Sequence, residues 1–266
     1  MYEFHGDKRY YFDMTKKVTA EHIIPYLEQN WQFPADMKVL EIGCGEAGVL
    51  QAFTDLSFHC TGIELEESRL EFAREYMKSE LDRGMVQFIN KNIYDVDPEV
   101  DLGTKFDLII LKDVIEHIPD QKKFMPQLQR FLNPGGVVFF AFPPWMMPYG
   151  GHQQVLPGKF ASKLPYYHLL PGKLYPLALR MFGVKANGIA TMEEIRSTGI
   201  SIERFERIVK RSGFSVVHRR FYLFNPIYKY KFGIQPRLQW GVIARIPWLR
   251  NFLTMGMYYI VSSKNH

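Results

Sequence analysis

Three glycines and one glutamate have the spacing of a nucleotide-binding turn. Gly43, Gly45 and Gly48 follow a short apolar run at residues 39–42, and a predicted helix comes directly after them. In such a unit the first glycine permits a tight turn, the second lets a ligand approach the backbone, and the third allows close helix packing. Glu64 ends the next apolar run, at the spacing of a carboxylate that binds ribose hydroxyls. A cluster of turn glycines without a ligand is the alternative interpretation.

A histidine that follows a pair of glycines, His152, lies in the segment after the predicted strand at residues 137–142. Loops beyond the carboxyl ends of parallel strands are where such sheets bind ligands. Because an imidazole titrates near neutral pH, His152 is a candidate general base. The alternative is a loop histidine that packs among the neighbouring aromatic side chains.

Alternating strands and helices must position these residues. Apolar runs predict seven strands, at residues 38–42, 59–63, 86–89, 106–111, 137–142, 214–223 and 257–261. Helices are expected at residues 14–30, 46–56, 66–81, 119–132 and 201–212. Strands that alternate with helices predict an α/β fold with a mainly parallel, doubly wound sheet.

Two insertions interrupt this alternation. Residues 143–199 are rich in proline, glycine and aromatic residues, and we expect them to form a cap over the carboxyl ends of the strands. Residues 225–255 mix aromatic residues with Lys and Arg before the last strand. No internal repeat is present, so the 266 residues predict a single domain with two embellishments.

The net charge of +5 conceals a strong asymmetry. Residues 1–150 carry 15 Lys/Arg and 24 Asp/Glu, a net charge of −9, whereas residues 151–266 carry 18 and 4, a net charge of +14. Such asymmetry indicates that the second half of the chain meets an anionic molecule. A solvated basic face without a partner is the alternative.

The composition also constrains the cellular setting. Cys44 and Cys60 show neither a zinc-binding spacing nor a disulfide framework, so we expect no metal site and a reducing, cytoplasmic location. The first residues lack the pattern of a signal peptide. No apolar run reaches the length of a transmembrane span.

Four motifs together resemble the class I S-adenosylmethionine-dependent methyltransferases. They are Val39-Leu-Glu-Ile-Gly-Cys-Gly45, Gly62-Ile-Glu64, the stretch from Phe106 to Asp120, and Leu132-Asn-Pro-Gly-Gly136. They occur in the family's order across residues 36–142. The resemblance implies a Rossmann-like methyltransferase fold, S-adenosylmethionine as cofactor, residues 36–142 as the cofactor-binding core, and residues 1–35 as a helical lid.

The resemblance also assigns the residues that would hold the cofactor. Gly43 and Gly45 would pass under its methionine part, Glu41 would hold the ammonium group, and Glu64 would accept hydrogen bonds from both ribose hydroxyls. As alternatives, Glu41 caps the following turn and the glycines only shape it.

The adenine end departs from the family's pattern. The family often has Gly-Asp after the third strand, where this chain has Lys91-Asn92. Asn92 and Ile93 are the residues expected beside the adenine, and Asp95 is a second candidate.

At the end of the fourth strand, Lys112 and Asp113 would flank the sulfonium and the acceptor, and His117 would follow them. There are two alternatives here. Asp113 could be the N-cap of a short helix at residues 114–117, and His117 could be a structural residue. Tyr11 would fold over the cofactor as part of the lid; alternatively, Tyr10 and Tyr11 only pack against the first helix.

These assignments predict methyl transfer to a small molecule. The basic, aromatic second half favours O-methylation of a sugar, a lipid-linked compound or another anionic metabolite, with His152, His117 or Asp113 as the catalytic group. Peripheral membrane contact is a further option, and nucleic acid, although basic aromatic grooves bind single strands, is a less favoured partner. The rival functions are a non-enzymatic cofactor-binding module and an NAD-dependent oxidoreductase.

Overall fold

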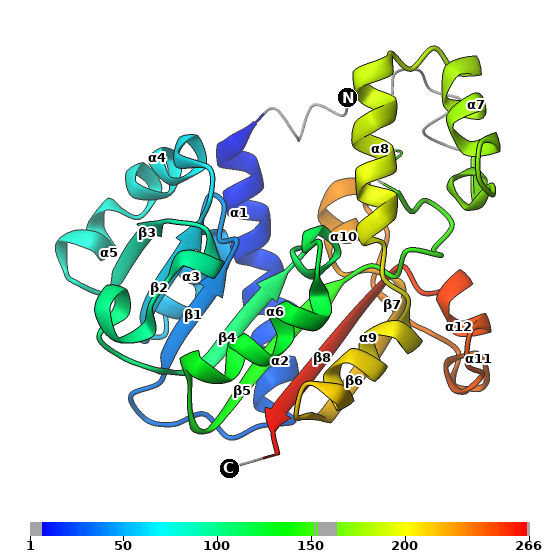
Figure 1. The fold of residues 1–266 in the computed structure, drawn as a ribbon. Helices are drawn as coiled ribbons and strands as arrows, with labels where there is room; N and C mark the ends of the chain where they lie inside the picture. Colours follow the sequence, from blue (N-terminus) through cyan, green and yellow to red (C-terminus); the bar gives the residue numbers. More distant parts are fainter. Residues whose placement is uncertain (1–6, 152, 154–163, 265–266) are drawn as a thin grey trace.

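The computed structural model describes residues 7–151, 153 and 164–264, and an eight-stranded sheet forms the centre of the molecule (Figure 1). Its strands follow the order β3-β2-β1-β4-β5-β8-β6-β7. Their bounds are β1 Lys38–Ile42, β2 His59–Glu64, β3 Val86–Asn90, β4 Phe106–Lys112, β5 Leu132–Phe142, β6 Phe214–Phe224, β7 Arg237–Leu238 and β8 Gly256–Ser263.

Strands β1 to β5 are parallel, and β8 runs antiparallel to both β5 and β6. The mainly parallel, doubly wound sheet predicted from the sequence is therefore confirmed. The predicted number of seven strands is wrong by one, because the two-residue strand β7 pairs with the edge of β6. Strand β7 lies in the second insertion, where aromatic and basic residues gave no alternating pattern.

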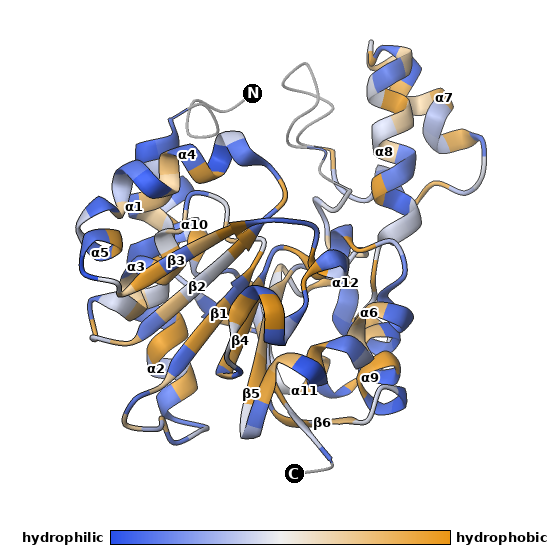
Figure 2. Ribbon diagram, turned by 60° about the vertical axis from the view of Figure 1, so that its left-hand side comes forward, coloured by the Kyte–Doolittle hydropathy of each residue, from blue (hydrophilic) through white to orange (hydrophobic). Residues whose placement is uncertain are grey.

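Both faces of the sheet are buried, which explains why its central strands read as continuous apolar runs. In β4, Leu108 and Ile110 pack into the core on one face, and Ile109 and Leu111 pack into the core on the other. The strands β1, β4 and β5 are accordingly coloured as hydrophobic along most of their length in Figure 2.

Helices cover both faces of the sheet. Phe12, Leu27, Phe53 and Leu70 bring α1 (Lys8–Val18), α2 (Ile24–Glu28), α3 (Gly48–Thr54) and α4 (Glu67–Tyr76) onto one core. Phe124 and Phe205 bring α6 (Gln121–Gln127) and α9 (Ile202–Arg211) onto the other.

The N-terminal helical stretch begins earlier than residues 14–30. Helix α1 starts at Lys8, because the Asp7 side chain accepts a hydrogen bond from the Tyr10 backbone N–H (2.9 Å) and caps it. A π-helix at Thr19–Ile23 joins it to α2. The stretch thus places Tyr11 on a regular helix.

Two predicted helices are shorter than expected. The helix predicted at 66–81 divides at Met77 into α4 and α5 (Lys78–Asp82). The one predicted at 119–132 comprises α6 and a 3₁₀ helix, Leu128–Phe131. Strand β5 then starts at Leu132, because Leu132 pairs with Phe106 before the register shifts. The Asn-Pro-Gly-Gly segment therefore belongs to the start of β5.

The segment after β5 forms a lobe with its own small core. Within it lie a 3₁₀ helix (Tyr167–Leu169), α7 (Leu174–Met181) and α8 (Ala186–Thr198). Tyr175 and Leu179 of α7 pack against Ile189 and Met192 of α8. Figure 1 shows α7 and α8 standing away from the sheet.

The insertion before β8 contributes three short helices besides β7. These are α10 (Ile227–Phe232), α11 (Gly241–Arg245) and α12 (Leu249–Phe252). Helix α10 touches the N-terminal helix, because the Tyr10 hydroxyl donates to the Tyr230 carbonyl (2.8 Å) and Lys229 pairs with Glu21 (2.7 Å). Of the helices in the described ranges, none has the length and apolar character needed to cross a bilayer.

Candidate active site

Two adjoining cavities open at the carboxyl ends of the parallel strands. The first, of about 490 Å³, is lined by Gly43, Gly48 and Glu64 and is called here the glycine-turn cavity. The second, of about 400 Å³, is lined by Trp145 and Lys231, among others, and is called the cap cavity. Six residues line both cavities, namely Tyr11, Glu46, Arg69, Lys112, Asp113 and His117. The two spaces therefore meet above the end of β4.

The turn after β1 leaves no room for side chains. Gly43 and Gly45 have φ values of +72° and +54°, a backbone region that favours glycine. A Cβ atom at Gly43 would lie 2.6 Å from Cγ2 of Val114, and one at Gly45 would lie 2.2 Å from Nη2 of Arg69. At Gly48 it would lie 2.3 Å from the Phe12 carbonyl oxygen, so α1 packs directly on this position.

The Glu64 carboxylate is held in one orientation by backbone donors. Its Oε2 accepts a hydrogen bond from the Gly45 N–H (2.8 Å), and its Oε1 accepts from the N–H groups of Leu65 (2.8 Å) and Glu66 (3.1 Å). The carboxylate thus ties the end of β2 to the glycine turn and lines the glycine-turn cavity. Two carboxylate oxygens offer more acceptor sites than these three bonds use.

Glu41 lies in the same cavity with an unsatisfied oxygen. It is buried, and its Oε2 has no hydrogen-bond partner within the described part of the chain. This oxygen does not cap the following turn. Burial raises the pKa of the Glu41 carboxyl well above its usual range, although the nearby Lys112 cation opposes the shift. A buried acceptor of this kind fits a ligand that brings its own donor group.

The far end of the glycine-turn cavity is formed by Asn92 and Ile93. The Asn92 side-chain oxygen accepts from the Tyr94 N–H (3.1 Å) and caps the 3₁₀ helix Ile93–Asp95. Asp95 is exposed and is not one of the residues lining this cavity, so the structure does not support it as the second adenine candidate.

Lys112 and Asp113 form an ion pair where the cavities meet, with 2.5 Å between Nζ and Oδ2. Burial alone would lower the pKa of Lys112, but the charge and hydrogen bond of Asp113, together with Tyr11 and Glu41, outweigh burial and the pKa is raised. For Asp113 burial would raise the pKa, but the charge and hydrogen bond of Lys112, together with the Lys231 and His117 charges, outweigh burial and the pKa is lowered. Both groups therefore keep their charges near neutral pH.

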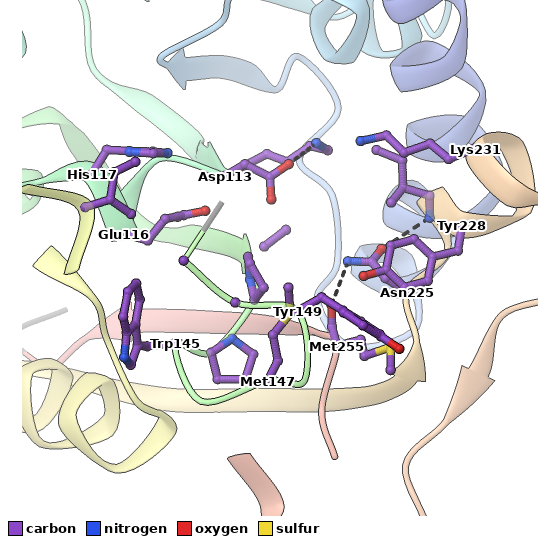
Figure 3. A pocket seen from close by; sticks show the side chains of 18 of the residues that line it. Asp113, Glu116, His117, Trp145, Met147, Tyr149, Asn225, Tyr228, Lys231 and Met255 are labelled. Carbon is purple, nitrogen blue, oxygen red and sulfur yellow. Dashed lines mark hydrogen bonds and ion pairs between the residues drawn. The ribbon is translucent and has the colours of Figure 1, made fainter. Parts of the chain in front are cut away.

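Asp113 has an unusual backbone conformation, with φ of +56°, and its N–H donates to the Ala141 carbonyl (2.7 Å). The N-cap alternative is wrong, because Val114 occupies the cap position of the 3₁₀ helix Ile115–His117 and no side chain caps it. The strained residue instead directs its carboxylate toward Lys112, between the two sides of the cap cavity (Figure 3).

His117 and Glu116 face the site from the 3₁₀ helix after β4. Burial lowers the pKa of His117, and Asp113 partly opposes this shift, so the imidazole is neutral at neutral pH. Glu116, absent from the predicted site, lines the cap cavity and is 8% exposed. Burial, followed by the Asp113 charge, raises the pKa of its carboxyl well above the usual range. Its Oε2 has no hydrogen-bond partner among the described residues.

The opposite wall of the cap cavity comes from α10 and was also missed. Figure 3 shows Lys231 and Tyr228 across the cavity from Glu116 and His117, with Asp113 between the two sides. Burial lowers the pKa of Lys231 to about 8, an effect that the Asp113 charge opposes. The aromatic and basic composition of residues 225–255 was the available signal, but it did not single out Lys231.

The cap holds Trp145 in place as a wall of the cap cavity. Its backbone N–H donates to the Ile200 carbonyl (2.9 Å), and its carbonyl lies 2.8 Å from Nε2 of His168. A Cβ at Gly199 would lie 2.6 Å from the indole ring, so this glycine allows the close approach. His168 is buried, and burial lowers its pKa to about 4, which fits a structural role.

The remaining predicted positions are His152 and Tyr11. His152 falls outside the described residues, so its role as a base stays a prediction. Tyr11 lines both cavities from α1, whereas Tyr10 points to Tyr230 and lines neither.

Cys44 and Cys60 are buried free thiols. Across residues 7–151, 153 and 164–264, no group of three His, Cys, Asp or Glu side chains could hold a metal ion.

Residues 14–219 match the family described as "Methyltransferase domain". This match covers more than half of the chain. The chain belongs to this methyltransferase family. It is an S-adenosylmethionine-dependent methyltransferase, and S-adenosylmethionine is its cofactor.

Relatives and solved structures agree with this assignment. The methyltransferase is 28% identical over 141 residues to the Ubiquinone biosynthesis O-methyltransferase of Histophilus somni (strain 2336), a match that covers 50% of this chain and 58% of that protein. The chain spans about half the length of the curated relatives it matches.

Two solved structures share the fold. One is an S-adenosylmethionine-dependent methyltransferase from Clostridium acetobutylicum (14% identity, TM-score 0.56, covering 93% of this chain and 92% of that one). The other is a plantazolicin methyltransferase in complex with SAH (13% identity, TM-score 0.54, covering 96% and 88%). The match to the methyltransferase family therefore replaces the two rival functions considered from the sequence, an NAD-dependent oxidoreductase and a non-enzymatic cofactor-binding module.

The residues of the glycine-turn cavity fit this cofactor. Glu41 offers an unsatisfied acceptor to an ammonium group. Gly43 lines the cavity with its backbone alone. A Cβ at Gly43 or Gly45 would collide with the side chain of Val114 or Arg69, so neither position tolerates a larger residue without movement. Glu64 is oriented by three backbone donors, which leaves acceptor capacity for a vicinal diol.

Proposed function

We propose that this methyltransferase methylates a hydroxyl oxygen of a small acceptor that carries an anionic group on an apolar body. One observation carries the proposal. The cap cavity joins the glycine-turn cavity at Asp113 and His117, and its walls combine the Lys231 cation with the Trp145 ring. A sugar phosphate or a lipid-linked compound would satisfy this lining, and the relatives named as O-methyltransferases support oxygen as the methylated atom.

The cofactor assignments follow from the glycine-turn cavity. S-adenosylmethionine, when bound, supplies a methyl group that its sulfonium already activates. The protein then needs to orient the two reactants, exclude water and accept a proton from the acceptor. Glu41, Gly43, Gly45 and Glu64 would hold the methionine and ribose parts.

Asn92 and Ile93 would contact the adenine at the far end of the glycine-turn cavity. Asn92 already uses its side-chain oxygen as a helix cap, which leaves its amide N–H groups as donors toward the cavity. Tyr11 would close the site from α1, and Lys112 would lie beneath the place where the two cavities meet.

His117 is the proton acceptor that the geometry favours among the described residues. It lines both cavities, and its lowered pKa keeps the imidazole neutral and able to accept a proton at neutral pH. The Asp113 charge favours the imidazolium that results. Lys112 holds Asp113 in place through the ion pair. His152, from the same cap segment as Trp145, is the competing candidate.

Lys231 and Tyr228 would bind the anionic group of the acceptor. A Lys231 ammonium that is partly desolvated forms a stronger charge-assisted bond than an exposed one. The Tyr228 hydroxyl stays protonated, because burial raises its pKa to about 12, and it can therefore donate a hydrogen bond. Trp145 and Met147 would pack on the apolar part of the acceptor.

The test is methyl transfer from labelled S-adenosylmethionine to paired acceptors that differ only in the reacting atom, a hydroxyl, an amine or a thiol, each with and without a phosphate. We expect turnover of the phosphorylated hydroxyl compounds. His117→Ala should lower kcat by about a hundredfold and leave S-adenosylhomocysteine affinity unchanged, because the side chain serves the acceptor.

His152→Ala is the matched comparison. A large loss of kcat in His152→Ala with normal turnover in His117→Ala would transfer the base to His152. Preferred transfer to the amines would contradict O-methylation. Bound S-adenosylhomocysteine without turnover of any hydroxyl acceptor would contradict the proposed acceptor class.

A further inference from the structure

Helix α7 presents an apolar face to solvent. Leu174, Leu177 and Met181 are 52%, 52% and 79% exposed and follow the spacing of one helical face. Tyr175 and Leu179 form the opposite face and are buried in the small core of the cap. The cap core therefore accounts for one side of the helix and leaves the other without a partner among the described residues.

Residues 232–249, called here the C-terminal apolar segment, expose a second set of large apolar side chains. They lie at the end of α10, in β7, in α11, at the start of α12 and in the turns between these elements. The most exposed large side chains of the segment are Leu238, Trp240, Val242 and Trp248. The Arg237 guanidinium lies 5.9 Å from the centre of the Trp240 ring, so cationic and aromatic groups occur together on this surface.

Both apolar elements lie in a strongly cationic part of the chain. Residues 207–266 contain 11 Lys/Arg and no Asp or Glu. Around α7, Lys173, Arg180 and Lys185 are likewise without an acidic neighbour in sequence, since residues 151–192 contain none. In the folded chain, Glu203 accepts a hydrogen bond from the Trp248 N–H (3.0 Å) and pairs with Arg250, so the segment is not wholly without acidic neighbours. Exposed apolar side chains in a part of the chain with this excess of cations match a lipid surface with anionic headgroups.

The two elements lie on the same side of the molecule and flank the cap cavity. Figure 1 shows α7 and α8 above α11 and α12, all on one side of the sheet. The Tyr166 hydroxyl donates to the Phe252 carbonyl (2.8 Å), which joins the cap to α12. Ile195 of α8 and Lys231 of α10 line the cap cavity, and the exposed Phe232 follows Lys231 directly.

We propose that α7 and the C-terminal apolar segment dock the protein onto an anionic lipid bilayer. The exposed side chains insert among the headgroups, and Arg237, Arg245 and the cations around α7 contact the lipid phosphates. Docking in this way brings the cap cavity close to the bilayer, where an amphipathic acceptor resides. Protruding aliphatic side chains such as Met181 and Val242 fit acyl chains better than nucleic-acid bases, which favour aromatic platforms. The docking does not depend on the proposed function.

The test is sedimentation of the full chain with vesicles of phosphatidylcholine alone or mixed with phosphatidylglycerol. We expect binding to the mixed vesicles, weak binding to the neutral ones, and release as salt increases. The double variant Met181→Asp/Val242→Asp should bind the mixed vesicles at least about tenfold more weakly. Val100→Asp is the matched control, because Val100 is 84% exposed on the acidic half of the chain and should bind like the wild type.

A second pair of variants tests the electrostatic contribution to vesicle binding. Arg245→Gln should weaken binding to the mixed vesicles and reduce its salt dependence, whereas Lys17→Gln on the exposed side of α1 should do neither. Circular dichroism and melting temperature establish that each variant is folded.

Three outcomes would overturn the proposal. They are the absence of binding to mixed vesicles at low salt, equal binding by the double variant and Val100→Asp, and a wild-type dimer that Met181→Asp/Val242→Asp converts to a monomer without any vesicle binding. The last outcome would make this surface an interface between copies of the chain. Because no turnover enters the measurement, its result is independent of the acceptor assay.

Discussion

The glycine-turn cavity draws most of its lining from the ends of β1, β2 and β4, whereas the cap cavity collects side chains from segments between Lys8 and Tyr258. In the first, the groups proposed to hold the cofactor are backbone at the glycine turn and carboxylates in fixed orientations. In the second, the decisive groups are the tips of long side chains such as Lys231 and Tyr228. A ligand common to a whole family can be held by a short conserved geometry of the backbone, and a particular acceptor needs side chains that the rest of the fold brings together.

The largest effect is expected at the glycine turn. Gly43→Val should abolish S-adenosylhomocysteine binding, because its Cβ would meet Val114 at 2.6 Å and the residue has a φ of +72°. Isothermal calorimetry measures the affinity. Gly103→Val is the matched control, since Gly103 also has a positive φ, +61°, but nothing lies within 4 Å of an added Cβ. If Gly43→Val bound S-adenosylhomocysteine as tightly as Gly103→Val, the turn after β1 would not be the cofactor site.

A smaller loss of cofactor affinity is expected at Glu64. Glu64→Ala removes the carboxylate assigned to the ribose hydroxyls, and charge-assisted bonds contribute about 1.5–3 kcal/mol, so S-adenosylhomocysteine should bind about tenfold more weakly or worse. Because Glu64 also accepts from the Gly45 N–H, the melting temperature of the variant is measured alongside. Glu66→Ala, on the exposed neighbour, should leave the affinity unchanged. Unchanged affinity in Glu64→Ala would contradict the ribose assignment.

The glycine-turn cavity could be predicted from the sequence to a greater extent than the cap cavity, and the reason is physical. Gly43, Gly45 and Glu64 stand close together in sequence, and strand–turn–helix geometry determines where they must lie. Lys231 and Glu116 enter the cap cavity only because α10 and the 3₁₀ helix after β4 face each other in the folded chain. The sequence contains no periodicity from which this arrangement of the two elements could be predicted.

The boundaries of the elements show the same limit. The core strands were predictable because both faces of each are buried, which leaves continuous apolar runs. Strand β7 was missed, since its two residues, Arg237 and Leu238, are exposed and pair only with the edge of β6. The early start of α1 depended on the Asp7 cap. The positive φ of Asp113 has no signature in the sequence.

The acceptor side should respond to pH through Lys231. Its pKa of about 8 means that the ammonium is present below that pH and is lost as the pH rises through it. We therefore expect the KM for a phosphorylated acceptor to rise above pH 8, while S-adenosylhomocysteine affinity stays constant. In Lys231→Met the KM should be about tenfold higher and should lose this alkaline dependence.

Lys229→Met is the control for that series, because Lys229 is two residues away and pairs with Glu21 outside the cap cavity. An equal rise of KM in both variants would indicate a general effect of charge on α10 rather than contact with the acceptor.

The smallest effect is expected at Glu116. Its raised pKa means that the carboxyl holds its proton to a higher pH than an ordinary glutamate, so the neutral isostere in Glu116→Gln should keep turnover within about threefold at pH 6. Glu116→Ala, which leaves a cavity, should lose more. A large loss of kcat in Glu116→Gln at pH 6 would show that the ionised carboxylate takes part, and Glu116 would then replace His117 as the base.

The small core of the cap has a consequence for how this protein can change over generations. Tyr175, Leu179, Ile189 and Met192 pack against one another rather than against the sheet. Mutations that reshape α7 and the face of α8 that packs on it can therefore accumulate without disturbing the turn proposed to hold the cofactor. The lobe is suited to exchange between related proteins as a unit. Such an exchange would change the methyl acceptor while S-adenosylmethionine is kept as the methyl donor.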